Sequence, residues 1–206
     1  RIVKALTMGV ASLLKKNKIT SYTGTARLVG DKRLTVTTAE GDEELSAAHI
    51  LIATGSRPAT LPGVELDGDR IGTSTETLSY GEVPPRLVVI GAGYIGLELG
   101  TVWQRLGSEV TVLEYLDRIL PGTDGEIAGE AQKLFKKQGL NFRLGSQVSG
   151  ARVAGDHCVV ECVGVDPIEC DRVLVAVGRK PNSHGLGLET VGVKLNDKDF
   201  ISVDEQ

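Results

Sequence analysis

The spacing of apolar side chains changes in character along the first quarter of the chain. Residues 1–18 end in the basic run KKNK and carry apolar side chains at helical intervals, at Val3, Leu6, Val10, Leu13 and Leu14. Residues 19–51 instead form short β-type runs around the turn signals Gly30-Asp31 and Glu40-Gly41-Asp42. This part of the sequence therefore predicts a helix followed by an antiparallel ribbon of three strands.

Two segments of opposite character come next. The continuously apolar run HILIATG predicts a buried strand that ends at Gly55. Residues 57–85 are rich in proline and glycine and show no core-forming periodicity, which predicts a linker between two domains.

A β-α-β pattern begins at Arg86. The runs RLVVI and EVTVLE predict two buried strands. Between them the pattern predicts a helix that ends at Gly107 and buries one face, made of Ile95, Leu99, Val102, Trp103 and Leu106.

The remaining residues predict one more helix and several strands. Thr123 and Glu126 match a capping box, and the helix they begin continues to Gly139 with an apolar face of Ile127, Ala131, Leu134 and Phe135. LNFRLGSQV, ARVAGDHCVVECVGV and CDRVLVAVG predict strands. The sequence thus predicts an α/β fold with a parallel sheet and an antiparallel β-meander. The segments LIATGSRP and LVAVGRKP echo each other, as two related nucleotide domains would.

The three glycines of VIGAGYIGLELG have the spacing G-x-G-x-x-G, and they follow a strand and open a helix. In such a loop Gly91 permits the tight turn, Gly93 lets the backbone approach a pyrophosphate, and Gly96 allows close packing of helix on strand. The free N–H groups of the helix then face the phosphates. The loop predicts a dinucleotide site.

Glu114 lies 23 residues after Gly91, close to the roughly 20 expected for the residue that binds the adenosine ribose. A carboxylate there accepts from a free 2′-hydroxyl and repels a 2′-phosphate, which favours NAD over NADP. Arg118 is near enough to weaken this preference, although the adjacent Asp117 is the expected partner of its guanidinium.

Composition and charge narrow the classes of protein that fit. The net charge is −4 and no run of Lys or Arg exceeds two residues, which disfavours a nucleic-acid or membrane-surface role. No apolar segment approaches the roughly 18 residues that span a bilayer, so a soluble protein is expected. The three cysteines, Cys158, Cys162 and Cys170, are odd in number, which argues against a framework of disulfides. Cys158 and Cys162 lie on one face of a predicted strand, about 13 Å apart, which is too far for a disulfide bridge. No metal site is expected.

The run VVIGAGYIGLELGTVWQRLGSEVTVLEYLDRILPGTD, with LLKKNKIT before it and VLVAVGRKPN after it, resembles the dihydrolipoyl dehydrogenases of the pyridine nucleotide–disulfide oxidoreductase family. The resemblance covers essentially the whole chain. It implies part of an FAD-binding domain in residues 1–75, a Rossmann-like NAD-binding domain in 76–200 and the start of a return into the FAD domain in 201–206.

The same resemblance implies particular cofactor contacts. For NAD it implies Gly91, Ala92, Gly93, Tyr94, Ile95, Gly96, Leu97, Glu98, Glu114, Val148 and Gly178. Tyr94 would cover the nicotinamide pocket, and Glu98 would point toward nicotinamide and flavin. For FAD it implies Ala26, where the family usually has glycine, together with Thr54, Gly55 and Ser56.

The resemblance also implies an activity whose catalytic residues are expected outside this sequence. Dihydrolipoyl dehydrogenases take electrons from dihydrolipoamide that is attached to an acyltransferase subunit of a 2-oxo acid dehydrogenase complex. The electrons pass through a redox disulfide and FAD to NAD. The cysteine pair is expected before Arg1 and the His–Glu pair after Gln206, so we expect a fragment of a homodimeric enzyme that is inactive alone. A bacterial cytoplasm or a mitochondrial matrix would suit it. Two alternatives remain open: another member of the superfamily (a mercuric or glutathione-type reductase, or a transhydrogenase) and a non-catalytic NAD-binding module.

Overall fold

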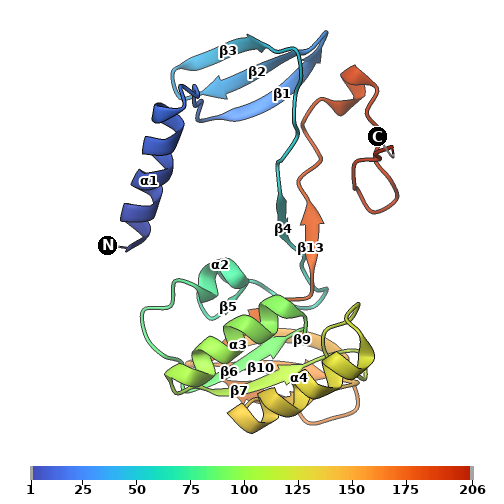
Figure 1. The fold of residues 1–206 in the computed structure, drawn as a ribbon. Helices are drawn as coiled ribbons and strands as arrows, with labels where there is room; N and C mark the ends of the chain where they lie inside the picture. Colours follow the sequence, from blue (N-terminus) through green and yellow to red (C-terminus); the bar gives the residue numbers. More distant parts are fainter. Residues whose placement is uncertain (1, 205–206) are drawn as a thin grey trace. The chain divides into compact units, whose positions relative to one another are not determined.

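The computed structural model describes residues 2–204, which divide into two compact units (Figure 1). Unit 1 comprises the residues up to Gly55 and those from Pro181 onward, and unit 2 spans Ser56–Lys180. These units are groups of residues in mutual contact, and the domain bounds at residues 75 and 200 remain predictions.

Unit 1 contains the predicted helix and the predicted ribbon. Helix α1 spans Ile2–Lys16, and strands β1 (Thr25–Gly30), β2 (Arg33–Thr38) and β3 (Gly41–Ser46) pair antiparallel in the order β1-β2-β3. The 3₁₀ helix η1 (Leu188–Val191) lies beside β1, where the Leu28 N–H donates to the Leu186 carbonyl at 2.8 Å. Both sequence predictions for this region are confirmed.

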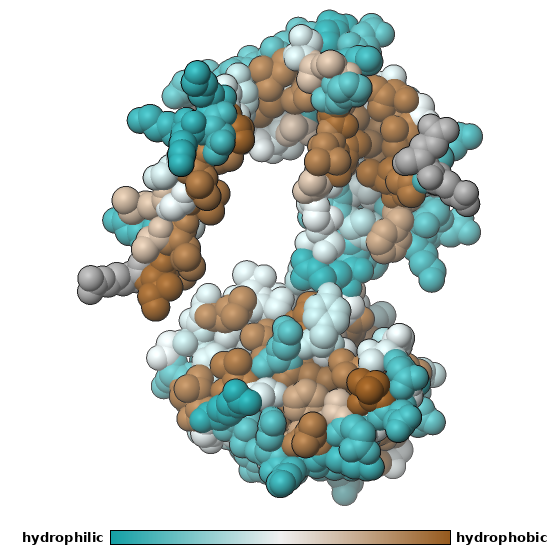
Figure 2. All heavy atoms as spheres, in the orientation of Figure 1, coloured by the Kyte–Doolittle hydropathy of each residue, from teal (hydrophilic) through white to brown (hydrophobic). Residues whose placement is uncertain are grey.

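The apolar run HILIATG is not a buried strand, and that prediction is wrong. Among the described residues no strand covers positions 47–55, and Leu51 is 91% exposed. Among the described residues the run is paired at its end, where the Gly55 carbonyl accepts from the Asn182 N–H at 3.0 Å. A buried strand needs such partners along its whole length. The apolar side chains of α1 are also exposed, at Ile2, Val3, Leu6, Val10 and Leu13. Figure 2 shows apolar side chains along the surface of this helix.

Unit 2 is built on a five-stranded parallel sheet in the order β5-β12-β6-β7-β8. Its strands are β5 (Ile71–Gly72), β6 (Arg86–Ile90), β7 (Glu109–Leu113), β8 (Asn141–Arg143) and β12 (Arg172–Val175). A second, antiparallel sheet has the order β11-β10-β9, formed by β9 (Val148–Ala154), β10 (His157–Cys162) and β11 (Ile168–Cys170). The predicted α/β class, with a parallel sheet and an antiparallel meander, is confirmed.

The parallel sheet is covered on both faces, which makes unit 2 a three-layer structure. Because side chains alternate along a strand, Leu87 and Val89 of β6 face the helices, whereas Val88 and Ile90 face the meander. The meander contributes the buried Cys158, Cys162 and Cys170, all of which are free thiols, so the expectation of no Cys158–Cys162 bridge is confirmed. Among the described residues, no helix has the length and apolar character needed to cross a membrane.

Residues 57–85 are part of unit 2 and not a linker, so that prediction is wrong. Ile71 of β5 is fully buried at the edge of the parallel sheet. The short helix α2 (Ser74–Thr77) begins with a capping box in which Thr73 and Glu76 bind each other's backbone. Loop residues satisfied by local caps carry no periodicity, which is why the pattern of apolar positions missed them.

The echoed segments LIATGSRP and LVAVGRKP end in two strands that pair with each other. Strand β4 is Ser56–Pro58 and β13 is Arg179–Pro181, and they form a two-stranded sheet where the chain enters and leaves unit 2. The Ala59 N–H extends this pairing by donating to the Gly178 carbonyl at 2.9 Å.

Helix α3 spans Tyr94–Leu106 and ends at Gly107 as predicted, but its predicted buried face is only partly correct. Trp103 is buried and Leu99 packs on the core as predicted. The buried residues are Gly96, Leu97, Gly100 and Trp103, whereas Val102 and Leu106 are about half exposed. Glycine carries no hydropathy signal, yet Gly96 and Gly100 bring the helix axis close to the sheet and thereby select this face.

Helix α4 spans Gly125–Gln138 and ends at Gly139, and its N-cap also differs from prediction. Asp124, not Thr123, caps the helix, because its carboxylate accepts from the N–H groups of Glu126 and Ile127. Of the predicted apolar face, Ala131 and Phe135 pack on the core beside the buried Ala128, but Ile127 and Leu134 are exposed.

The contact at Gly96 generates a stability prediction. A Cβ at Gly96 would lie 2.1 Å from the Gly91 carbonyl oxygen and 3.0 Å from Val89 Cγ1, so Gly96→Ala forces helix and strand apart. We expect a loss of about 2 kcal/mol or more in the free energy of unfolding, measured by urea denaturation.

Gly129→Ala in α4 is the matched control, since a Cβ there meets nothing within 4 Å. It should raise stability by about 0.5–1 kcal/mol through helix propensity. Equal effects of the two substitutions would contradict the packing role of Gly96.

The pairing of Asp171 with Arg86 generates a prediction of pH dependence. The Asp171 carboxylate accepts from the backbone N–H of Arg86 at 2.8 Å and from its Nε and Nη2, and these bonds hold the pKa of Asp171 below its usual value. A carboxyl whose pKa is lowered on folding adds stability above its unfolded pKa and loses it as the pH falls through the folded one.

Asp171→Asn should therefore lower the unfolding midpoint at pH 7, and the difference from the parent protein should shrink as the pH falls below about 4. Thermal unfolding from pH 7 to pH 3 measures this. The exposed Asp166→Asn serves as control and should show no such dependence. A difference that persists unchanged at pH 3 would rule out the carboxylate as its source.

Candidate functional site

Three strands of the parallel sheet end at the same edge. Ile90 at the end of β6 is in register with Leu113 of β7 on one side and with Val175 of β12 on the other. The chain runs from β6 to β7 and β8 on one side before it crosses to β12 on the other. Ligands of open α/β sheets bind in the crevice at such a point, outside the carboxyl ends of the strands.

The loop after β6 requires glycine at two positions for structural reasons. Gly91 has φ +106°, and a Cβ there would lie 2.5 Å from the Ala176 carbonyl oxygen. Gly96 contacts the Gly91 carbonyl, as described above. Both glycines shape the loop and are needed whether or not a ligand binds.

Gly93 differs from its two neighbours in the motif. Its backbone is extended, with φ −75° and ψ 177°, and a Cβ added to it would meet nothing within 4 Å. It lines a cavity, so the open space beside it is available to a ligand. No packing constraint in the structure explains glycine at this position.

The first turn of α3 presents free N–H groups at this place. The N-cap Gly93 has no side chain to cap the helix, and the first intrahelical bond is that from the Leu97 N–H to the Gly93 carbonyl at 3.1 Å. The amides that precede Leu97 in the helix therefore have no intrahelical acceptor, and together with the helix dipole they favour an anion.

Glu114 follows β7 and lies against the glycine loop. Glu114 is only 8% exposed, yet it lines the cavity. Carboxylate oxygen Oε2 accepts from the Ala92 N–H at 2.7 Å, and Oε1 accepts from the Leu116 N–H at 3.0 Å. A carboxylate oxygen has two lone pairs, so each oxygen can accept one more hydrogen bond.

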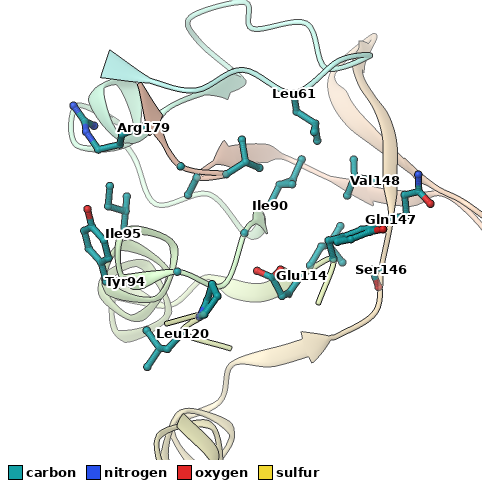
Figure 3. Close-up of a pocket in the computed structure, with 18 of the residues that line it drawn as sticks. Leu61, Ile90, Tyr94, Ile95, Glu114, Leu120, Ser146, Gln147, Val148 and Arg179 are labelled. Atoms are coloured by element: carbon teal, nitrogen blue, oxygen red, sulfur yellow. The ribbon is translucent and has the colours of Figure 1, made fainter. Parts of the chain in front are cut away.

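The cavity has a volume of about 750 Å³, within the usual range for ligand pockets. Figure 3 shows Tyr94, Ile95 and Arg179 at one end, and Ser146, Gln147 and Val148 at the other, with Glu114 between them. An elongated ligand that reaches both ends therefore passes the glycine loop and Glu114.

Most of the residues expected at an NAD site meet in this cavity. Its lining includes Gly91, Gly93, Tyr94, Ile95, Glu114, Val148 and Gly178. The other four expected residues lie differently: Ala92, Gly96 and Leu97 are buried, and Glu98 is exposed on α3. Tyr94 is 64% exposed, which leaves its ring free to change position.

The four residues expected at an FAD site do not line this cavity. Ala26 lies on β1, paired with Val36. Thr54 donates through Oγ1 to the Asn182 carbonyl at 2.7 Å, and the Gly55 carbonyl accepts from the Asn182 N–H at 3.0 Å. Ser56 Oγ accepts from Arg179 Nε at 2.7 Å.

Several lining residues were not singled out from the sequence. Ser146 and Gln147 follow β8, and Arg179 follows β12, so each comes after a parallel strand, where ligands of such sheets bind. That position was a usable signal. Leu61 belongs to the segment interpreted as a linker and gave no signal of its own.

The expected partner of Arg118 is also wrong. Its Nη2 donates to the Thr123 carbonyl, not to Asp117. The guanidinium therefore holds the turn before α4, and among the described residues Arg118 is not part of the cavity lining.

Comparisons with known proteins agree with this architecture. The family model described as pyridine nucleotide-disulphide oxidoreductase matches residues 1–206. Dihydrolipoyl dehydrogenase 3 of Pseudomonas aeruginosa is 51% identical over 205 residues, which is 97% of this chain and 44% of that protein. The mitochondrial dihydrolipoyl dehydrogenase of Rattus norvegicus is 44% identical, and the match covers 98% of this chain and 41% of the rat protein.

Solved structures give the same result. LpdA from Mycobacterium tuberculosis superposes with a TM-score of 0.90 at 28% identity, covering 98% of this chain and 46% of that one. A flavoprotein disulfide reductase from Escherichia coli superposes with a TM-score of 0.86 at 27% identity, and the match covers 96% of this chain and 45% of the reductase chain. The chain thus spans less than half the length of these relatives, and it belongs to the pyridine nucleotide-disulphide oxidoreductase family.

Proposed function

We propose that the cavity at the carboxyl edge of the sheet binds NAD, and that unit 2 is the nucleotide-binding domain of a larger flavoprotein. The observation that carries this proposal is the open space at Gly93 beside the free amides of α3. A pyrophosphate needs both close approach to the backbone and unpaired N–H donors, and the residues at this loop supply both.

The two ends of the cavity suggest how the dinucleotide lies. With the pyrophosphate at Gly93, the adenosine ribose reaches the Glu114 carboxylate and the adenine extends toward Val148. The nicotinamide then lies at the end formed by Tyr94, Gly178 and Arg179. NAD would supply a hydride acceptor there, and Tyr94 would cover the ring site. Glu98, exposed on α3 outside the cavity lining, is proposed to face the nicotinamide and flavin in the whole protein.

The preference for NAD over NADP rests on charge. The Glu114 carboxylate is an acceptor for two ribose hydroxyls and repels a 2′-phosphate. Arg118, the nearby cation that could have favoured a phosphate, is held at the Thr123 carbonyl.

For the whole protein we propose the oxidation of protein-bound dihydrolipoamide with NAD, through FAD and a redox disulfide. The support is the 51% identity with a dihydrolipoyl dehydrogenase, well above the 27% shared with the reductase from Escherichia coli. Ala26, Thr54 and Gly55 of unit 1 would contact FAD, and so would the next residue in the chain, Ser56. The acyltransferase-borne dihydrolipoamide and a second copy of the protein are the proposed partners, in a bacterial cytoplasm or a mitochondrial matrix.

Substitution of Gly93 tests the nucleotide site. Gly93→Val should leave the fold intact, because its backbone is extended and its Cβ is unobstructed, but should weaken NADH binding by about tenfold or more, or about 1.4 kcal/mol. NADH fluorescence titration measures this, with Gly129→Ala in α4 as a control that should bind as the parent does. Unchanged affinity in a folded Gly93→Val protein would contradict the assignment.

The proposed specificity has its own test in the unaltered chain. Titrations with NADH and NADPH at equal ionic strength should give the tighter dissociation constant for NADH. NADPH binding as tight as NADH binding would overturn the role of Glu114 while leaving a dinucleotide site in place.

A further inference from the structure

Glu114 makes more contacts with the protein than a residue that serves only a ribose would need. Its backbone N–H donates to the Arg143 carbonyl at 3.0 Å, and its carbonyl accepts from the Ser146 N–H at 2.8 Å. Both carboxylate oxygens accept backbone N–H groups, those of Ala92 and Leu116. Every polar group of Glu114 is thus bonded without any ligand.

No ion pair involves Glu114 in the part of the chain that the structure describes. A nearly buried carboxylate without a cation depends on hydrogen-bond donors for its stability. Here these donors are the two amides, so the charge of Glu114 and the positions of Ala92 and Leu116 depend on each other.

Ala92 is the residue through which this dependence reaches the glycine loop. It is fully buried between Gly91 and Gly93, and its carbonyl accepts from the Leu120 N–H at 2.9 Å. Its N–H has Glu114 Oε2 as acceptor. Loss of that acceptor would leave a buried donor unpaired, which is costly enough to displace the loop.

We propose that Glu114 is a positioning residue for the glycine loop as well as a ribose ligand, so that cofactor preference cannot be reversed at this position alone. The ribose contact rests on the proposed function, whereas the positioning role does not. The carboxylate cannot rotate away from a 2′-phosphate without breaking two charge-assisted bonds. Arginine at position 114 supplies no acceptor, so it leaves both amides unpaired.

Amide hydrogen exchange by NMR, in the 206-residue chain without nucleotide, tests the positioning role. In Glu114→Ala the amides of Ala92 and Leu116 should exchange at least about tenfold faster than in the parent. In Glu114→Gln, which keeps one acceptor oxygen and has nearly the same shape, one of the two amides should lose protection. Glu109→Gln, which removes the same charge at the other end of β7, is the control and should change neither amide.

NADH and NADPH titrations of the same proteins and of Glu114→Arg complete the experiment. Glu114→Arg should bind both nucleotides more weakly than the parent binds NADH. Unchanged exchange in Glu114→Ala, or NADPH binding by Glu114→Arg as tight as NADH binding by the parent, would overturn the positioning role. Weaker NADH binding with unchanged exchange in Glu114→Ala would overturn the positioning role and leave the proposed ribose contact in place. Faster exchange in Glu114→Ala with unchanged NADH affinity would overturn both roles.

Discussion

Strand β6 is hydrogen-bonded on both sides, to β7 and to β12, and the location of the candidate site follows from this pairing. The register brings the ends of the three strands to one edge of the sheet. From that edge the chain continues into the glycine loop, into Glu114 and into the Ala176–Gly178 segment, so groups far apart in sequence face one cavity. Shifting β6 by one residue would exchange its two buried faces and would remove Gly91 from its contact with Ala176.

The sequence was sufficient where the relevant interactions are local. The β6-α3-β7 unit, the helix ends at Gly107 and Gly139, and the position of Glu114 beside the loop all follow from residues close together in the chain. Strong periodicity and glycine C-caps leave few alternatives for such segments. Seven of the residues expected around NAD accordingly line one cavity.

It was insufficient where a residue's role depends on what it packs against. The two-residue strand β5 is too short to carry a periodic signal, and only its position beside β12 identifies it. The run HILIATG has strand-like composition but no strand beside it in unit 1. On α3 the buried face is selected by glycines, which a count of apolar side chains ignores. In each case the deciding information lies in the neighbouring element.

The pairing of β4 with β13 has a consequence for how this architecture can change. Unit 2 leaves and rejoins the remainder of the chain through two adjacent strands, so its two ends are neighbours in space. A domain with adjoining ends can be inserted, exchanged between proteins or circularly permuted without lengthening the connections. A structural unit attached in this way could be acquired or replaced in evolution as a single cassette.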